Sequence, residues 1–302
     1  FSYILIFIFS FLPLLKLIKK EQPNFLIAHL VTSLPLVIFA FFNHKTKLVL
    51  NIAGHPRINF VRKLIWKLSA KKIFRIVCPS NELKETLISQ KIFDESKIIV
   101  IQDPHLIIKE INELKNEKNE DVFLKNDKIL ISIGRLTKQK NYIFLISNFK
   151  KLLFKFNDIK LLIIGDGEEK RILQNLITKL HIEDKVKLIG YKKNIYKYLK
   201  VSNYYISTSI WEGSSLAMID AAFMGLPILC SNCPTGRKEF INNDEKGFLY
   251  NEGDSKDFLN KFEKMYRSNA HDVKTQLIKA KKESKKFTLL NHSFKLSNIL
   301  KN

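Results

Sequence analysis

The stretch "YYISTSIWEGSSLAMIDAAFMGLPILCS", Tyr204–Ser231, decides the fold prediction. It opens with a short apolar run, "YYISTS", continues through the helix-length segment "SSLAMIDAAFM", and ends in a second apolar run, "LPILCS". Short continuous apolar runs on both sides of a helix-length segment are typical of parallel strands joined by a crossover helix. The stretch therefore predicts one strand–helix–strand unit, with its helix beginning near Ser214.

The same alternation extends through the rest of the chain. Further apolar runs are "NFLIAHL", "KLVLNIAG", "RIVCPS" and "KIIVIQDP" in the first half, and "KILISIG", "IKLLIIGDG" and "KVKLIG" in the second. A polar stretch, "KEINELKNEKNEDVFLKNDK", separates the two series and is the best linker candidate. We expect an α/β protein with two doubly wound domains: residues 1–110, a linker at 111–127, and residues 128–302.

The composition fits a globular protein, with 46% hydrophobic and 26% charged residues. The formal net charge of +22 would attract nucleic acid, anionic lipid or phosphorylated ligands. A compositional bias toward Lys, Ile, Asn and Phe explains the charge equally well. No basic-aromatic module typical of nucleic-acid binding accompanies the charge, so we expect no nucleic-acid partner.

Two sequence features bear on the cell compartment. The three cysteines are too few for a disulfide framework, which fits a reducing compartment. Cys230 and Cys233 lack the second ligand pair that a zinc site needs, so we do not expect a zinc site. The opening "FSYILIFIFSFLPLLKLIKK" is slightly short of a bilayer span and lacks the features of a signal peptide. We expect a buried helix there rather than a membrane anchor. Because the opening lacks an initiator methionine, we expect the chain to be a fragment or a trimmed product.

Polar residues at the predicted strand ends are the candidates for ligand binding, because open α/β sheets bind ligands beyond the carboxyl ends of their strands. Arg135 and Lys140, in "IGRLTKQKN", suit a diphosphate, although ordinary surface cations are the alternative. In "IIGDGEEKR", Gly165 and Gly167 permit either a tight turn or close approach to a ligand, whereas a third fingerprint glycine would fall at Lys170.

Two acids, Glu212 and Asp220, flank the predicted start of the helix after "YYISTS". They would lie roughly 12 Å apart along the helix axis, with an anion-binding helix terminus between them. That spacing suits a nucleotide-sugar: one acid for sugar hydroxyls, the helix terminus for phosphates, and one acid for ribose hydroxyls. The alternative is structural, with Glu212 stabilising the helix dipole and Asp220 making a local bond.

A family resemblance emerges from the blocks "ISIGRLTKQKNYIFLISNF", "LLIIGDGEE", "VKLIGY", "YYISTSIWEGSSLAMIDAAFMGLPILCSNCPTGRKEFI" and "GFLY". Their order and spacing resemble the retaining glycosyltransferases of family 4. The similarity is strong over residues 128–260 and weaker in the first half. It implies the GT-B fold, in which two Rossmann-like domains face a cleft, with the N-terminal domain incomplete. The subgroup implied comprises bacterial enzymes that extend surface polysaccharides or lipid-linked oligosaccharides.

The resemblance implies catalytic roles for four residues. Arg135 and Lys140 would hold the donor diphosphate, and Glu212, the first acid of the family's E-x7-E motif, would contact the transferred sugar. His55, in "AGHP", would lie near that sugar, with a structural role as the alternative.

The resemblance also implies a set of donor-binding residues. Backbone N–H groups at the helix start would bind phosphate, Asp220 would meet the ribose, and Tyr191 would lie near the base. The whole set is Gly134, Gly165, Gly167, Tyr191, Gly213, Ser214, Ser215, Leu216 and Asp220.

The implied function is retaining transfer of a hexose or N-acetylhexosamine from a nucleotide diphosphate sugar to a glycan or lipid-linked acceptor, without a cofactor or a metal ion. Two departures from the family pattern stand against it: Asp220 replaces a glutamate, and the family's N-terminal glycine-rich loop is absent from the sequence. The alternatives are a catalytically impaired transferase-like subunit or binding module, and a sugar-nucleotide epimerase of related fold.

The segment "RINFVRKLIWKLSAKKIFR", Arg57–Arg75, combines cations with large apolar residues. This composition is typical of an amphipathic helix at a membrane surface, and equally of a packed helix with solvated lysines. We expect a cytoplasmic protein, with peripheral contact at the inner face of the cytoplasmic membrane.

Overall fold

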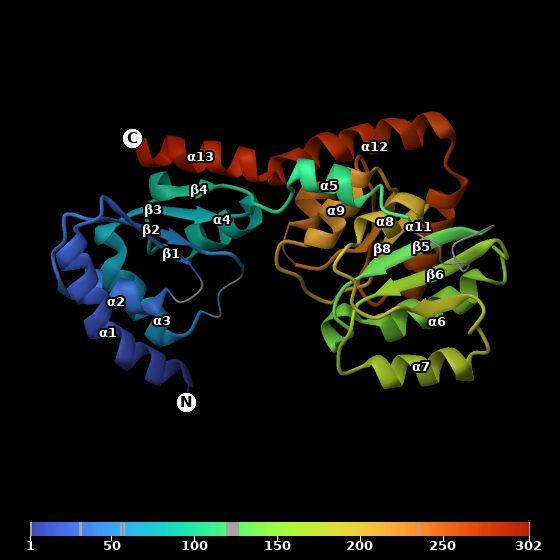
Figure 1. Ribbon diagram of the computed structural model, residues 1–302, viewed down its shortest axis with the longest axis horizontal. Coiled ribbons are helices and arrows are strands. Elements are labelled where there is room, and N and C mark those ends of the chain that lie inside the picture. Colours follow the sequence, from blue (N-terminus) through green and yellow to red (C-terminus); the bar gives the residue numbers. More distant parts are fainter. Residues whose placement is uncertain are drawn as a thin grey trace. The chain divides into compact units, whose positions relative to one another are not determined.

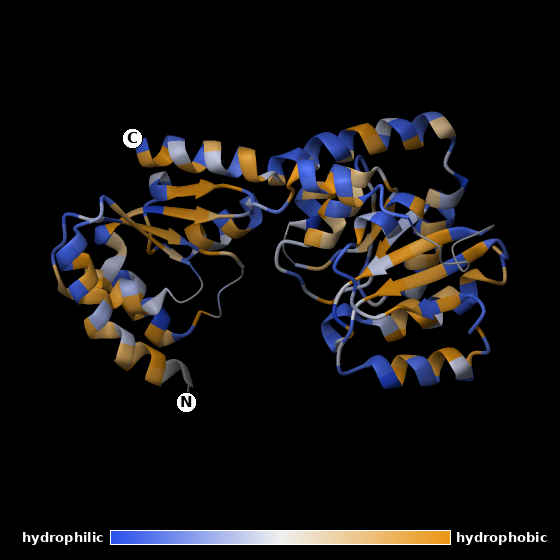
Figure 2. Cartoon of the chain, in the orientation of Figure 1, coloured by the Kyte–Doolittle hydropathy of each residue, from blue (hydrophilic) through white to orange (hydrophobic). Residues whose placement is uncertain are grey.

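The computed structural model describes residues 2–29, 32–54, 56, 58–118, 127–234 and 236–301. The chain forms two compact units, one of Phe1–Asp103 with Ser293–Asn302 and one of Pro104–His292. Each unit contains its own parallel sheet (Figure 1). The strands of both sheets are mostly hydrophobic (Figure 2), as expected for strands covered on two faces. The predicted α/β class with two parallel sheets is confirmed.

The first unit has a four-stranded sheet in the order β1-β2-β3-β4. Its strands are β1 (Phe25–His29), β2 (Lys47–Asn51), β3 (Ile73–Cys78) and β4 (Ile98–Val100). Its helices are α1 (Ser2–Glu21), α2 (Ser33–Phe41), α3 (Phe60–Ser69) and α4 (Asn81–Ser89), joined by the end of α13 (Leu289–Lys301). Leu48 and Leu50 face α1 to α4, whereas Val49 faces α13, because side chains alternate along a strand.

The second unit has a six-stranded sheet in the order β10-β9-β8-β5-β6-β7, and all its pairings are parallel. Its strands are β5 (Lys128–Ile133), β6 (Ile159–Ile164), β7 (Val186–Leu188), β8 (Tyr204–Ser207), β9 (Ile228–Ser231) and β10 (Phe248–Tyr250). One core lies between the sheet and the helices α6 (Tyr142–Leu152), α7 (Lys170–Lys179) and α11 (Ser255–Arg267). The opposite core involves α5 (Ile108–Leu114), α8 (Tyr196–Val201), α9 (Leu216–Met224), α10 (Arg237–Ile241) and α12 (Ala270–Ser284).

The two units differ from the expected domains in their boundaries. Leu106 and Ile111 are buried in the core of the second unit, so that unit begins before residue 110 and continues into the expected linker. At the other end, Leu296 and Ile299 of α13 pack on Val49, which returns the last residues to the first unit. The middle of the expected linker, residues 119–126, lies outside the described residues.

The helix expectations have mixed outcomes. Ser80 caps α4, because its Oγ accepts a hydrogen bond from Leu83 N at 3.2 Å. The opening segment forms α1, but only one face of α1 is buried: Leu15 is 8% exposed, whereas Phe9 is 73% exposed. Among the residues that the structure describes, no helix combines the length and apolar composition of a membrane span.

Candidate functional site

The sheet of the second unit has a topological switch point between β5 and β8. From β5 the chain proceeds to β6 and β7 on one side, and the later strands β8, β9 and β10 extend the other side. The loops that follow β5 and β8 are bonded to each other: Ile210 N donates to Gln139 O at 2.9 Å, and Gln139 Nε2 donates to Trp211 O at 2.8 Å. Ligands bind at such crevices in open α/β sheets, so this is the candidate site.

Glu212 lies in the loop after β8, and its side chain is 8% exposed. Oε1 accepts hydrogen bonds from Lys140 Nζ at 2.7 Å, Arg237 Nη2 at 3.1 Å and Ser209 Oγ at 2.5 Å. Burial alone would raise the pKa of Glu212, but the charges of Arg237 and Lys140 outweigh it and hold the pKa below its ordinary value. The structure thus brings together two predicted residues, Glu212 and Lys140, as a buried ion pair.

Arg237 is a residue of this cluster that the sequence predictions missed. Its side chain is 1% exposed and it donates to three serine hydroxyls: Ser215 at 2.9 Å, Ser231 at 2.8 Å and Ser207 at 2.6 Å. Ser207 ends β8, Ser231 ends β9, and Ser215 directly precedes α9. The available signal was an arginine inside the family-like block "PTGRKEFI", but sequence spacing does not show that it folds back onto Glu212.

The start of α9 lies one loop beyond Glu212. The helix begins at Leu216 rather than near Ser214, because Ser215 has a left-handed backbone with φ of 42°. The Ser215 hydroxyl makes no cap bond to the helix and instead accepts from Arg237. Gly213 and Leu216 are exposed there, so this helix terminus opens to solvent beside the Glu212 cluster.

The predicted glycines allow the loops after β5 and β6 to pack closely. A Cβ on Gly167 would lie 2.5 Å from the Leu136 carbonyl, and one on Gly165 would overlap the Gly134 carbonyl. A Cβ on Gly134 would lie 2.9 Å from Cε of Lys140, so this glycine leaves room for the lysine stem. Close loop packing and a path for Lys140 are therefore the structural reasons for these glycines.

Two other predicted residues, Arg135 and Tyr191, are exposed. Arg135 is exposed and has no ion-pair partner among the described residues. Tyr191 follows the edge strand β7, and its side chain is 75% exposed. His55 lies outside the described residues, so its prediction has no structural counterpart here.

Asp220 has different surroundings from Glu212. It is one turn into α9 and 2% exposed, and both of its oxygens are occupied. Oδ2 lies 2.8 Å from His105 Nε2, and Oδ1 accepts from Tyr196 Oη at 2.8 Å. Burial, reinforced by the Asp220 charge, raises the pKa of Tyr196, which keeps this phenol protonated. His105 and Tyr196 were not predicted from the sequence.

The cysteine pair is buried beneath the cluster. Cys230 is fully buried, and burial raises its pKa to about 12, so it stays a neutral thiol at neutral pH. Within the described part of the chain, no group of three His, Cys, Asp or Glu side chains could hold a metal ion.

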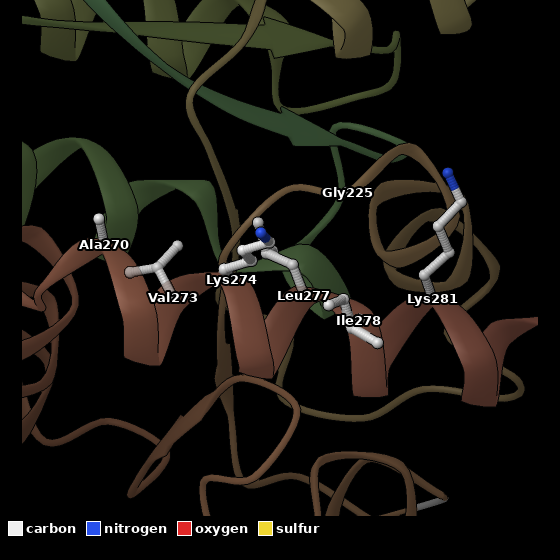
Figure 3. A pocket seen from close by; sticks show the side chains of 7 residues that line it. All are labelled: Gly225, Ala270, Val273, Lys274, Leu277, Ile278 and Lys281. Carbon is white, nitrogen blue, oxygen red and sulfur yellow. The ribbon is translucent and has the colours of Figure 1, made fainter.

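A groove of about 420 Å³ lies between α12 and the end of α9 (Figure 3). Its lining residues are Gly225, Ala270, Val273, Lys274, Leu277, Ile278 and Lys281. Gly225 ends α9, whereas the Glu212 cluster lies before the start of the same helix. None of the predicted site residues lines this groove.

Comparison with known proteins gives consistent results. The family model described as "Glycosyl transferases group 1" matches residues 113–284, more than half of the chain. An uncharacterized glycosyltransferase of Methanocaldococcus jannaschii is 33% identical over 246 residues, covering 76% of this chain and 60% of its own length. An Escherichia coli protein named UDP-Gal:alpha-D-GlcNAc-diphosphoundecaprenol alpha-1,3-galactosyltransferase is 29% identical over 265 residues, covering 80% of this chain and 65% of its own length.

Among solved structures, Anabaena Alr3699/HepE in complex with UDP superimposes with a TM-score of 0.79 at 18% identity, covering 96% of this chain and 82% of that one. The chain spans about three fifths of the length of the curated relatives it matches. The predicted family and fold class are confirmed: the chain belongs to the glycosyl transferases group 1 family, and its fold is GT-B.

Proposed function

We propose that the protein transfers a hexose or N-acetylhexosamine, with retention of configuration, from a nucleotide diphosphate sugar to a glycan or lipid-linked acceptor. The observation that carries the proposal is the Glu212 cluster at the switch point between β5 and β8. Support also comes from relatives. The Escherichia coli relative is named for galactose transfer to a diphosphoundecaprenol-linked sugar, and the Anabaena structure contains UDP.

The charges of the cluster suit a departing diphosphate. Lys140 and Arg237 bring two positive charges against the one negative charge of Glu212, so the group retains a net positive charge. The Lys140 ammonium has three N–H donors, and one is directed at Glu212. With exposed Arg135 and the N–H groups of Ser214 to Leu216, it would bind the diphosphate and stabilise its developing charge during transfer.

Glu212 would act on the sugar. Because neighbouring cations keep it ionised, its carboxylate accepts hydrogen bonds from sugar hydroxyls and stabilises positive charge at the anomeric carbon. Lys140 and Arg237 fix its position before the donor arrives, which lowers the cost of ordering the site.

The experiment that tests this function is a transfer assay with a panel of UDP-, GDP- and ADP-sugars and lipid-diphosphate acceptors. Mass spectrometry identifies a glycosylated acceptor, and NMR of the product determines the configuration of the new bond. The proposal predicts an acceptor-dependent product with the donor's configuration. An inverted product contradicts retention, and epimerised donor without acceptor supports the rival enzyme class.

We also propose peripheral contact with the inner face of the cytoplasmic membrane. On α3, Phe60 is 81% exposed and Val61 is 61% exposed, next to exposed Lys63 and Lys67. Trp66 does not belong to this surface, because it is 3% exposed and packs against Phe93. The predicted amphipathic segment is thus reduced to α3, which ends at Ser69. Apolar side chains beside lysines favour an anionic lipid surface.

Vesicle co-sedimentation tests the membrane proposal. Wild type should sediment with vesicles containing phosphatidylglycerol and much less with phosphatidylcholine, and Phe60→Asp should reduce the bound fraction. Phe154→Asp is the matched control, because Phe154 is 80% exposed on the second unit. Equal binding of both vesicle types, or equal losses in the two variants, overturns the proposal.

A further inference from the structure

The buried acid of α9 is tied to a histidine from a distant part of the chain. Asp220 and His105 are 115 residues apart in sequence, yet Oδ2 and Nε2 are 2.8 Å apart. The Asp220 side chain is 3% exposed, whereas the His105 side chain is 24% exposed. The carboxylate is thus enclosed, and the imidazole is the member of the pair that reaches solvent.

The main chain around His105 is also fixed. His105 N and Leu106 N both donate to Phe287 O at 2.9 Å, and Leu289 N donates to Leu106 O at 3.1 Å. With the backbone held and one ring nitrogen bonded to Asp220, the imidazole has little freedom to rotate. Such a ring is oriented in advance for a ligand.

The Asp220 carboxylate determines what the imidazole can offer. An ionised carboxylate only accepts hydrogen bonds, so His105 Nε2 carries the proton and, in the neutral ring, Nδ1 carries a lone pair. No hydrogen-bond partner for Nδ1 lies within the described part of the chain. Tyr196 occupies the other oxygen of Asp220 and completes its enclosure. Nδ1 can therefore accept a hydrogen bond from a hydroxyl group of a ligand.

The position of the pair indicates which hydroxyl. Asp220 lies four residues after Leu216, which places it about 6 Å along the axis from the start of α9. If the diphosphate binds at that helix start, the next group of the donor nucleotide is its ribose. The chain carries aspartate where the family motif has glutamate, so its carboxylate reaches one methylene less far. The imidazole of His105, in contact with Asp220 Oδ2 at 2.8 Å, extends the polar surface of this shorter acid.

We propose that His105 contacts the ribose hydroxyls of the donor nucleotide and that Asp220 is a positioning residue that fixes the imidazole. The inference rests on the proposed donor function and deepens it. It assigns ribose recognition to a carboxylate–imidazole pair rather than to the carboxylate alone.

The test is calorimetric titration with UDP, ADP and GDP, each compared with its 2′-deoxy and 3′-deoxy form. Wild type should bind one ribonucleotide about tenfold more tightly than at least one deoxy form, as expected for loss of a hydrogen bond. In His105→Phe, which keeps ring volume without ring nitrogens, this ratio should fall below about twofold. His271→Ala is the matched control, because His271 is an exposed histidine on α12, and it should keep the wild-type ratio.

A second variant pair covers a folding defect in His105→Phe. The ratio should be lost in His105→Ala and restored in the double variant His105→Ala, Asp220→Glu, because the longer carboxylate then fills the space of the imidazole. If folded His105→Phe or His105→Ala keeps the wild-type ratio, the inference is overturned while the donor function stands. If wild type binds none of the nucleotides, the donor function falls, and the inference falls with it.

Discussion

Lys140 Nζ lies 2.7 Å from Glu212 Oε1, although 72 residues separate the two in sequence. The pair joins the loop after β5 to the loop after β8, which are the loops that flank the switch point of the sheet. Both side chains are largely buried, and Arg237 adds a second cation to the same oxygen. A buried carboxylate with two cations is costly to desolvate, and the three hydrogen bonds to Oε1 offset part of that cost.

Glu212→Gln should lower sugar transfer by about a hundredfold or more, because the amide cannot stabilise positive charge at the anomeric carbon. Glu263→Gln is the matched control, since Glu263 belongs to a partly exposed pair on α11. Initial rates at saturating donor are the measurement. Equal rates for the two variants would contradict the role of Glu212.

Arg237→Ala should destabilise the second unit by about 3–5 kcal/mol, because it leaves the buried Glu212 with one cation fewer and three serine hydroxyls without their donor. Arg267→Ala, in an exposed pair with Glu263, should change the free energy of unfolding by less than about 1 kcal/mol. Urea unfolding followed by circular dichroism measures both changes. A small loss in Arg237→Ala would show that the network contributes little to stability.

The pH dependence of stability follows from the lowered pKa of Glu212. A carboxyl whose folded pKa lies below its unfolded pKa contributes stability above the unfolded value and loses it as pH falls through the folded value. The difference in unfolding free energy between wild type and Glu212→Gln should therefore be full at pH 7 and shrink below the ordinary value of 4.5. Urea titrations at several pH values give this difference, and a constant gap down to pH 3 would disagree with it.

Gly165→Ala should destabilise the second unit by about 2–4 kcal/mol, because the added Cβ overlaps the Gly134 carbonyl at a φ of 151°. Gly54→Ala offers the comparison, since a Cβ there meets nothing within 4 Å, and it should change stability by about 0.5 kcal/mol or less. Thermal unfolding of the two variants is the check. Similar midpoints would mean that the loops separate easily.

Local patterns in the sequence predicted much of the fold. The apolar runs identified the strands β1 to β9. Glu212 and Lys140 were proposed from strand ends and family spacing, and the fold brings them together. The β10 strand, Phe248–Tyr250, was not predicted as a strand.

The missed features depend on distant pairings. Arg237 reaches Glu212 across 25 residues, and His105 reaches Asp220 across 115, so no periodicity signals either contact. The return of α13 to the first unit is of the same kind, because the apolar residues Leu296 and Ile299 indicate a packed helix face but not the sheet on which it packs. Sequence patterns indicate burial, whereas the folded chain decides which groups meet.

The central claim is that the Glu212 cluster, formed with Lys140 and Arg237, binds the diphosphate of a nucleotide donor. Calorimetric titration of Lys140→Ala with UDP, ADP and GDP tests this claim most directly. Lys179→Ala is the control, because Lys179 is an exposed lysine at the end of α7. Wild type and Lys179→Ala should bind one nucleoside diphosphate with similar affinity, and Lys140→Ala should bind it at least about tenfold more weakly. Equal affinity in all three proteins would contradict the claim.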